Sequence, residues 1–221
     1  VFLLEDHELP LVEAAMTIRT GEIYEPAEKV GLAEITAAVL RSGGTQKIPG
    51  DALDLWLEKR AAALWAGMGD DSGWAGFHCL KEDFAEVYDV FLEVLRNPAF
   101  PQEKFELELT QQRTDIAKRN DNPTSILYRE FNKAVQRTKD GKLSPYIRPT
   151  EYETLGAIRR EDLAAFHKAH FHPGRFILSV TGDFNAAEVR ARIEKSFGAW
   201  PEEGPKLPER PALSTKREAK L

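Results

Sequence analysis

The chain has 221 residues, 42% of them hydrophobic, with 12 Phe and 4 Trp, which is enough apolar material for one large core. A net charge of −6 without a Lys/Arg stripe argues against nucleic-acid binding, which needs a basic surface. No apolar run approaches the roughly 20 residues that span a bilayer, and the single Cys79 excludes an internal disulfide. The chain starts at Val1 without a Met or a leader, so we expect any targeting signal to lie outside this segment.

The first 80 residues alternate between strand-like and helix-like patterns, separated by turn-forming Gly, Pro, Asn and Asp. In chain order they predict strands at 1–4 and 12–19, helices at 26–44 and 51–62, and strands at 63–68 and 73–80. Asp51 is the expected N-cap of the second helix. Aromatic residues around the last two strands are expected in the core or, in part, along a cleft: Trp56, Trp65, Trp74 and Phe77.

The remainder of the chain is dominated by helical spacing. It predicts helices at 82–96, 101–119, 123–136, 151–156, 160–170 and 186–197, and a buried strand at 176–182. Strands and long helices that alternate irregularly indicate an α+β fold with helices packed on one sheet. We expect residues 1–200 to form one domain, and the Pro-rich residues 201–221 to form a linker toward a second half outside this segment.

Residues 31–45 read GLAEITAAVLRSGGT and have the frame of a helix that carries the inverted zinc motif H-x-x-E-H. In that motif two His at i and i+4 hold the metal and the Glu activates its water. The corresponding residues here are Glu34, Ala37 and Ala38. Alanine has no lone pair to offer a metal, so the ligands and the base of such a site are missing.

Further short segments accompany this helix in a characteristic order and spacing. They are 1–10, 21–33, 80–84, 97–101, 120–123, 144–146, 149–150, 158–167, 182–184 and 197–201. Together they make the chain resemble, over nearly its whole length, the first half-domain of the insulinase/pitrilysin family of metallopeptidases, which includes the mitochondrial processing peptidase. The resemblance implies an α+β half-domain, with a mixed, mostly antiparallel sheet and helices packed on one face.

The resemblance also implies where a third zinc ligand would stand. In the family it is a Glu on a later helix, with some 75 residues between it and the second His, and Asp115 lies at the matching distance after Ala38. Zinc catalysis needs three protein ligands and a base, so we expect no bound zinc and no other cofactor, although the family uses zinc. As alternatives, Glu34 is a partly exposed helix carboxylate, and Asp115 pairs with Arg113 or Arg119 or faces solvent.

A second candidate metal site is His167, His170 and His172. His at i and i+3 share a helix face, and a third imidazole follows at the helix end. The competing interpretation is packing and capping at a helix C-terminus, which the helix dipole favours.

In the family, the substrate adds as an extra strand to the edge strand that follows the second helix. The resemblance places that strand at Ala63, Leu64, Trp65, Ala66, Gly67 and Met68. Strand addition needs only exposed N–H and C=O groups, so peptide binding can survive the loss of zinc. The competing interpretation is an edge covered by a partner subunit.

The function implied by the resemblance is that of a non-catalytic peptidase homologue. It would pair with a second insulinase-like half or subunit, one that can carry an intact zinc motif, and help to enclose and bind an unfolded peptide. Two alternatives remain: a structural subunit without peptide binding, and an active zinc metalloendopeptidase with relocated ligands at the His cluster. The resemblance favours the periplasm, and the cytoplasm stays open.

Overall fold

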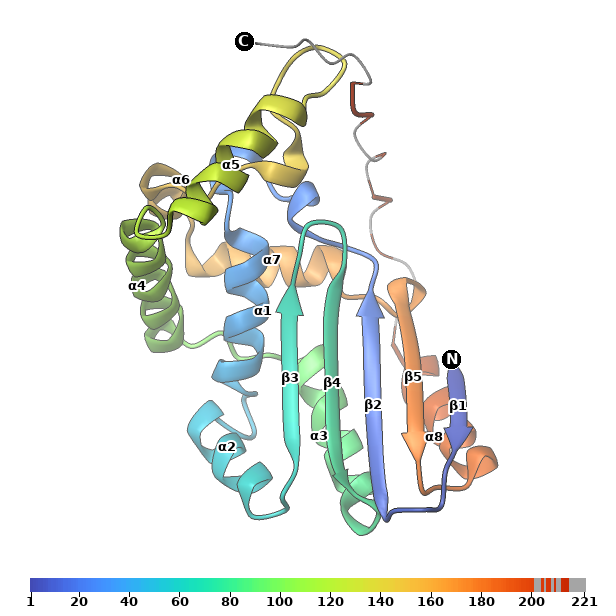
Figure 1. Cartoon of the computed structure of the whole chain (residues 1–221). Coiled ribbons are helices and arrows are strands. Elements are labelled where there is room, and N and C mark those ends of the chain that lie inside the picture. Colours follow the sequence, from blue (N-terminus) through green and yellow to red (C-terminus); the bar gives the residue numbers. More distant parts are fainter. Residues whose placement is uncertain (201–203, 205, 208, 210–211, 215–221) are drawn as a thin grey trace.

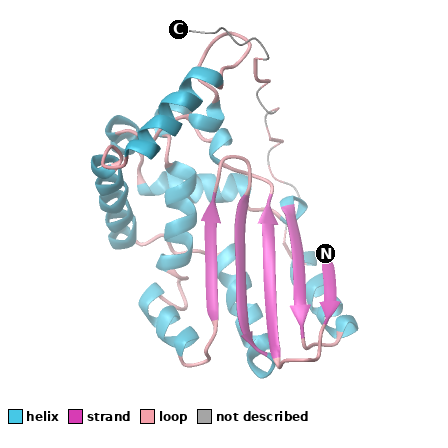
Figure 2. Ribbon diagram, in the orientation of Figure 1, coloured by secondary structure: helices cyan, strands magenta, loops and turns pink. Residues whose placement is uncertain are grey.

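The computed structural model describes residues 1–200, together with residues 204, 206, 207, 209 and 212–214. Five strands form one sheet in the order β1-β5-β2-β4-β3 (Figures 1 and 2). Their bounds are β1 (Phe2–Glu5), β2 (Leu11–Ile18), β3 (Ala63–Met68), β4 (Gly73–Leu80) and β5 (Phe176–Gly182). β1 pairs parallel with β5 and the remaining pairs are antiparallel, so the expected mixed, mostly antiparallel sheet is confirmed.

The helices that contact the sheet all lie on one of its faces (Figure 2), and the described chain contains eight α-helices in total. They are α1 (Leu32–Gly43), α2 (Gly50–Glu58), α3 (Phe84–Arg96), α4 (Gln102–Lys118), α5 (Pro123–Val135), α6 (Tyr152–Ala157), α7 (Arg160–His170) and α8 (Ala186–Gly198). Along β2 the side chains alternate between exposed and buried, which is the pattern of a sheet covered on one side. The α+β architecture with helices on one face is therefore confirmed.

Five short 3-10 turns connect these elements. They are η1 (Glu22–Tyr24), η2 (Ala27–Lys29), η3 (Lys81–Asp83), η4 (Pro145–Ile147) and η5 (Pro173–Arg175). None of the described helices has the length and apolar character needed to cross a membrane.

One core lies between the sheet and the helices. Phe77 on β4 is fully buried and packs against the Phe91 ring of α3, with ring centroids 5.2 Å apart. Tyr88 on the same helix is also buried, and its hydroxyl bonds the Ser196 hydroxyl of α8 at 2.7 Å. Aromatic residues of α3 thus join this helix to β4 and α8.

Two helix boundaries differ from the sequence prediction. The helix expected from residue 26 begins only at Leu32, because Gly31 adopts a left-handed conformation with φ of 102° and 3-10 turns precede it. The helix expected to end at Ala62 ends at Glu58, and Ala61 turns the chain with φ of 48°. Asp51 was wrongly predicted as an N-cap, since it makes no cap bond and instead pairs with Lys104 Nζ at 2.6 Å.

Of the four aromatic residues expected in the core or along a cleft, Phe77 is fully buried and Trp56 packs partly buried against the core. Trp74 is 48% exposed, and Trp65 and Trp56 are partly exposed. Trp65 and Trp74 lie on the uncovered face of the sheet, because strand side chains alternate and their neighbours Leu64 and Ala75 point into the core. Most of the linker predicted at 201–221 lies outside the described residues.

Candidate functional site

The N-terminus of α1 is held by a side chain that the sequence pattern did not single out. Glu25 is buried, and its two carboxylate oxygens accept hydrogen bonds from the N–H groups of Gly31 at 3.1 Å and Ala33 at 2.9 Å. It thereby satisfies main-chain donors that every helix leaves free at its start. Burial raises the pKa of Glu25 to about 7, against the opposing effect of these hydrogen bonds and of Arg148.

The three motif positions on α1 have different surroundings. Glu34 is exposed, Ala38 is half-buried, and Ala37 is buried with 1% of its surface exposed. Glu34 and Ala38 are four residues apart and therefore share a helix face. Glu34 and Ala38 thus reach the surface on one side of α1, whereas Ala37 is a core residue.

Helix α4 brings its carboxylates to the same region. Loss of hydration raises the pKa of Glu34, a side-chain hydrogen bond from Gln112 lowers it, and the negative charges of Glu108 and Asp115 raise it further. Gln112 is buried, and its Nε2 donates to Glu108 Oε1 at 3.1 Å. The third-ligand position predicted from chain distance therefore does lie within electrostatic reach of Glu34.

Asp115 itself is exposed and accepts hydrogen bonds from Gln111 Nε2 at 3.0 and 3.2 Å. The expected alternative of a pair with Arg119 is wrong, since Arg119 Nη2 pairs with Glu151 Oε2 at 2.6 Å. The part of the prediction that left Asp115 facing solvent is correct.

These residues do not fit zinc. The donors that remain are carboxylates and one amide, a hard set that suits Mg²⁺ or Ca²⁺ better than zinc. The amide of Gln112 is already engaged with the carboxylates around it. Among the described residues, no group of three or more His, Cys, Asp or Glu is arranged to hold a metal ion. We therefore derive no catalytic step through a metal here.

Two of the three His of the second candidate site have separate partners, whereas neither ring nitrogen of His172 has a hydrogen-bond partner among the described residues. His167 Nε2 lies 2.8 Å from the Leu95 carbonyl oxygen, and the His170 ring stacks on Phe166 at 4.1 Å between centroids. Arg175 Nη1 donates to His170 Nδ1 at 3.1 Å, and burial lowers the pKa of His170 to about 4. This geometry matches packing at a helix end, and we do not propose a metal site there.

The predicted peptide-binding strand, β3, is the last strand of the sheet (Figure 1). In an antiparallel pair, successive residues direct their main-chain groups alternately toward the partner strand and away from it. Three hydrogen bonds show which residues face away. Ala62 N–H donates to Leu57 O at 3.0 Å and Leu64 O accepts from Arg41, so the even-numbered residues face away from β4. Gly69 N–H donates to Ser72 O across the hairpin, so the odd-numbered residues face β4. The outward-facing residues of β3 are thus Leu64, Ala66 and Met68.

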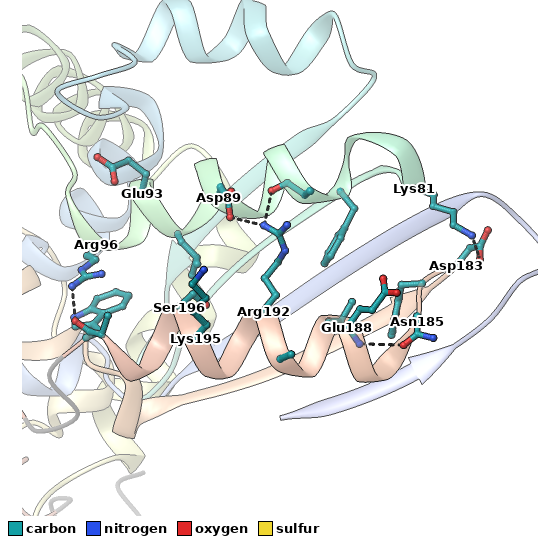
Figure 3. Close-up of a pocket in the computed structure, with 18 residues that line it drawn as sticks. Lys81, Asp89, Glu93, Arg96, Asp183, Asn185, Glu188, Arg192, Lys195 and Ser196 are labelled. Atoms are coloured by element: carbon teal, nitrogen blue, oxygen red, sulfur yellow. Dashed lines mark hydrogen bonds and ion pairs between the residues drawn. The ribbon is translucent and has the colours of Figure 1, made fainter.

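A separate groove of about 1070 Å³ lies between α3 and α8 (Figure 3). Two ion pairs lie among its lining residues: Arg192 Nη1 of α8 with Asp89 Oδ1 of α3 at 2.9 Å, and Lys81 Nζ of η3 with Asp183 Oδ1, just before α8, at 2.8 Å. None of the predicted site residues lines it. The groove is a charged seam between two helices and is not part of the candidate site.

Comparison with protein-family models shows the family to which the chain belongs. The family model described as insulinase, peptidase family M16, matches residues 1–147, more than half of the chain. The chain belongs to this family. A second M16 model, described as the peptidase M16 inactive domain, matches residues 157–220.

Individual M16 relatives are distant. A zinc protease of Rickettsia felis is 22% identical over 196 residues, which cover 87% of this chain and 47% of that protein. A zinc protease of Mycobacterium leprae is 27% identical over 124 residues, covering 55% of this chain and 27% of that protein. The chain thus spans about half or less of the length of these relatives.

Solved structures agree in fold. A peptidase M16 inactive domain from Pseudomonas fluorescens has a TM-score of 0.82 at 21% identity, covering 95% of this chain and 50% of that chain. A protease from Helicobacter pylori has a TM-score of 0.78 at 18% identity, covering 96% of this chain and 51% of that chain. At these identities the likeness shows the fold alone.

Sequence reasoning missed three residues of the candidate site: Glu25, Arg41 and Gln112. Glu25 precedes α1 by seven positions, beyond the spacing of ordinary capping motifs. Gln112 and Arg41 resemble any polar helix residue in the sequence. Their roles depend on contacts with distant segments, for which a single sequence carries no signal.

Proposed function

We propose that this chain is a non-catalytic M16 half-domain that binds an extended peptide along the edge of β3. The observation that carries the proposal is the free edge beside α1. Within the described part of the chain, no group bonds the outward N–H and C=O of Ala66 or Met68. Such groups are what an added strand pairs with.

The small residues along this edge support close approach of a second backbone. Ala66 is half-buried, and Ala38 on the neighbouring helix face has no side chain beyond Cβ. Figure 1 shows α1 directly beside β3. An added strand would therefore be bordered by β3 on one side and by the positions of the degenerate zinc motif on the other.

Pairing with a second half-domain is part of the same proposal. The chain covers 47% of the Rickettsia felis relative and 50% of the Pseudomonas fluorescens chain, which leaves room for a second half in proteins of this type. A second half with an intact H-x-x-E-H motif would supply the metal and the base that this chain lacks. The structural-subunit alternative predicts pairing without peptide binding.

Peptide binding is tested with a fluorescein-labelled peptide of alternating Thr and Val, blocked at both ends. The matched control is the same peptide with N-methylated main-chain amides, which cannot donate to a strand edge. We expect fluorescence anisotropy to report saturable binding of the first peptide and at least tenfold weaker binding of the second. Equal binding of both, or none at millimolar peptide, would contradict the proposal.

A variant of the protein isolates the edge. Ala66→Pro removes an outward N–H without removing a β3–β4 hydrogen bond, a position where strands tolerate proline. Binding should fall about tenfold or more, whereas Ala66→Ser, which keeps the N–H, should bind like the parent chain. Thermal unfolding of both variants checks that the fold is retained.

A further inference from the structure

The open part of the β3 edge is bounded on both sides. Below it, the outward N–H of Ala62 is bonded to Leu57 O at 3.0 Å at the end of α2. Above it, Gly69 O accepts from the Glu22 N–H at 3.0 Å and Gly69 N–H bonds Ser72 O at 3.0 Å. Between these limits, the residues of β3 whose main-chain N–H and C=O groups face outward are Leu64, Ala66 and Met68.

One of these three residues is already engaged by a side chain. Arg41, in the last turn of α1, donates from Nε to the Leu64 carbonyl oxygen at 2.6 Å. Its Nη2 pairs with Asp54 Oδ1 of α2 at 2.8 Å. The guanidinium is mostly shielded, with 24% of the Arg41 side chain exposed, so both contacts act on a partly desolvated charge.

The contact sits on the same helix face as the degenerate zinc motif. Glu34, Ala38 and Arg41 follow one another at i, i+4 and i+7, the spacing of one face. Helix α1 runs opposite to β3 (Figure 1). Because Arg41 meets the Leu64 end, Ala38 and Glu34 lie progressively toward the Ala66 and Met68 end.

We propose that Arg41, held by Asp54, is a specificity-determining stop at the Leu64 end of the strand edge. A peptide pairs with β3 through Ala66 and Met68, and its pairing ends where the guanidinium occupies Leu64 O. The inference rests on the proposed peptide binding at β3 and adds to it the extent and register of pairing. When the peptide is bound, the Leu64 N–H therefore has no main-chain partner.

The test compares the parent chain with Arg41→Met, which keeps the aliphatic stem and removes every donor. We expect the blocked Thr/Val peptide to bind Arg41→Met about threefold to tenfold more tightly, the gain of about one hydrogen bond. Asp54→Asn, which loosens the guanidinium without removing it, should give a smaller gain. Arg190→Met is the matched control, because Arg190 is exposed on α8, and it should leave affinity unchanged.

Amide hydrogen exchange with bound peptide gives a second readout. In the parent chain, Ala66 and Met68 should gain protection while Leu64 should not; in Arg41→Met, Leu64 should gain it as well. If the parent chain and Arg41→Met bound the peptide with equal affinity and both protected Leu64, the role proposed for Arg41 would be wrong, although peptide binding at β3 would stand. Absence of binding by both proteins would overturn the proposed function and the stop with it.

Discussion

Glu25 shows how one buried residue orients the helix on which the candidate site depends. Its carboxylate bonds two N–H groups at the start of α1, including that of Gly31 in the left-handed conformation. Arg148 Nη2 donates to the main-chain oxygens of Glu22 and Glu25 at 3.0 and 3.2 Å, so the turn before the helix is held from the other side. The direction of α1, and with it the direction of Glu34, depends on this junction.

Replacing this cap should be costly. Glu25→Ala leaves two N–H groups at a buried helix start without acceptors, and we expect it to lower the free energy of unfolding by about 2–4 kcal/mol. Glu25→Gln keeps one acceptor oxygen and should lose about half as much. Urea unfolding followed by circular dichroism measures both.

The matched control for this prediction is Glu28→Ala. Glu28 lies three residues further on and is exposed to solvent, so its loss should change stability by less than about 0.5 kcal/mol. A Glu25→Ala protein as stable as Glu28→Ala would show that water satisfies the freed N–H groups.

At the scale of elements, the β3–β4 hairpin is packed on its uncovered face by Trp rings lying over glycines. Gly67 pairs across the strands with Trp74, and Trp65 pairs with Gly76. A Cβ atom built on Gly76 would lie 2.6 Å from the Trp65 ring, and one built on Gly67 would meet the Trp74 ring. Both glycines therefore make room for the hairpin's own aromatic rings.

The two glycines should differ in their tolerance of substitution. A Cβ on Gly76 would also lie 2.5 Å from the Ala14 carbonyl oxygen of β2, whereas the nearest atoms to one on Gly67 all belong to the Trp74 side chain. We expect Gly76→Ala to destabilise the protein by about 2–3 kcal/mol and Gly67→Ala by about 1 kcal/mol, both through overpacking.

A double-mutant cycle checks the cause. In a Trp74→Ala background the cost of Gly67→Ala should disappear, while the cost of Gly76→Ala should remain, because it arises from main-chain contact with β2. Thermal unfolding of the single and double variants gives the comparison. Equal costs at both glycines in both backgrounds would point to strand flexibility instead of ring contact.

At the scale of the whole molecule, α1 and α4 bring together residues far apart in the chain. The negative charges of Glu108 and Asp115 on α4 raise the pKa of Glu34 on α1, and Gln112 of α4 donates to Glu108 Oε1. The family resemblance gave the spacing between Ala38 and Asp115 along the chain. The approach of α1 and α4 in space is a property of the fold. We propose that the frame of a zinc site remains here without its ligands.

Restoring the ligands tests this frame. The triple variant Glu34→His, Ala38→His, Asp115→Glu should bind about one zinc per chain, measured by metal analysis after dialysis, since three ligands and an open water position suffice. Ala37 stays unchanged, because it is buried and the motif's Glu is not a ligand. The control variant Glu34→His, Ala38→His, Asp115→Ala should hold zinc much more weakly; equal retention would mean that α4 supplies no ligand.

The sequence alone determined the parts of this protein that depend on local patterns. Periodicity and turn residues located the five strands and eight α-helices of the described chain, missed the start of α1 and the end of α2, and gave the bounds of β3 and β4 as the structure has them. The order of motifs gave the family and the α+β fold. The absence of the motif's second His at Ala38 and of its Glu at Ala37 followed directly from residue identity, because alanine can neither coordinate a metal nor act as a base.

Only the tertiary structure decided which main-chain N–H and C=O groups of β3 are free to pair with another strand. The strand pairing placed β3 at the sheet edge, and its phase turned Leu64, Ala66 and Met68 outward. The positions of Arg41 against Leu64 O and of Glu25 against the start of α1 also follow from packing. The physical reason is that hydrogen bonding and burial at these positions arise between segments distant in the chain, while composition and spacing describe only neighbours.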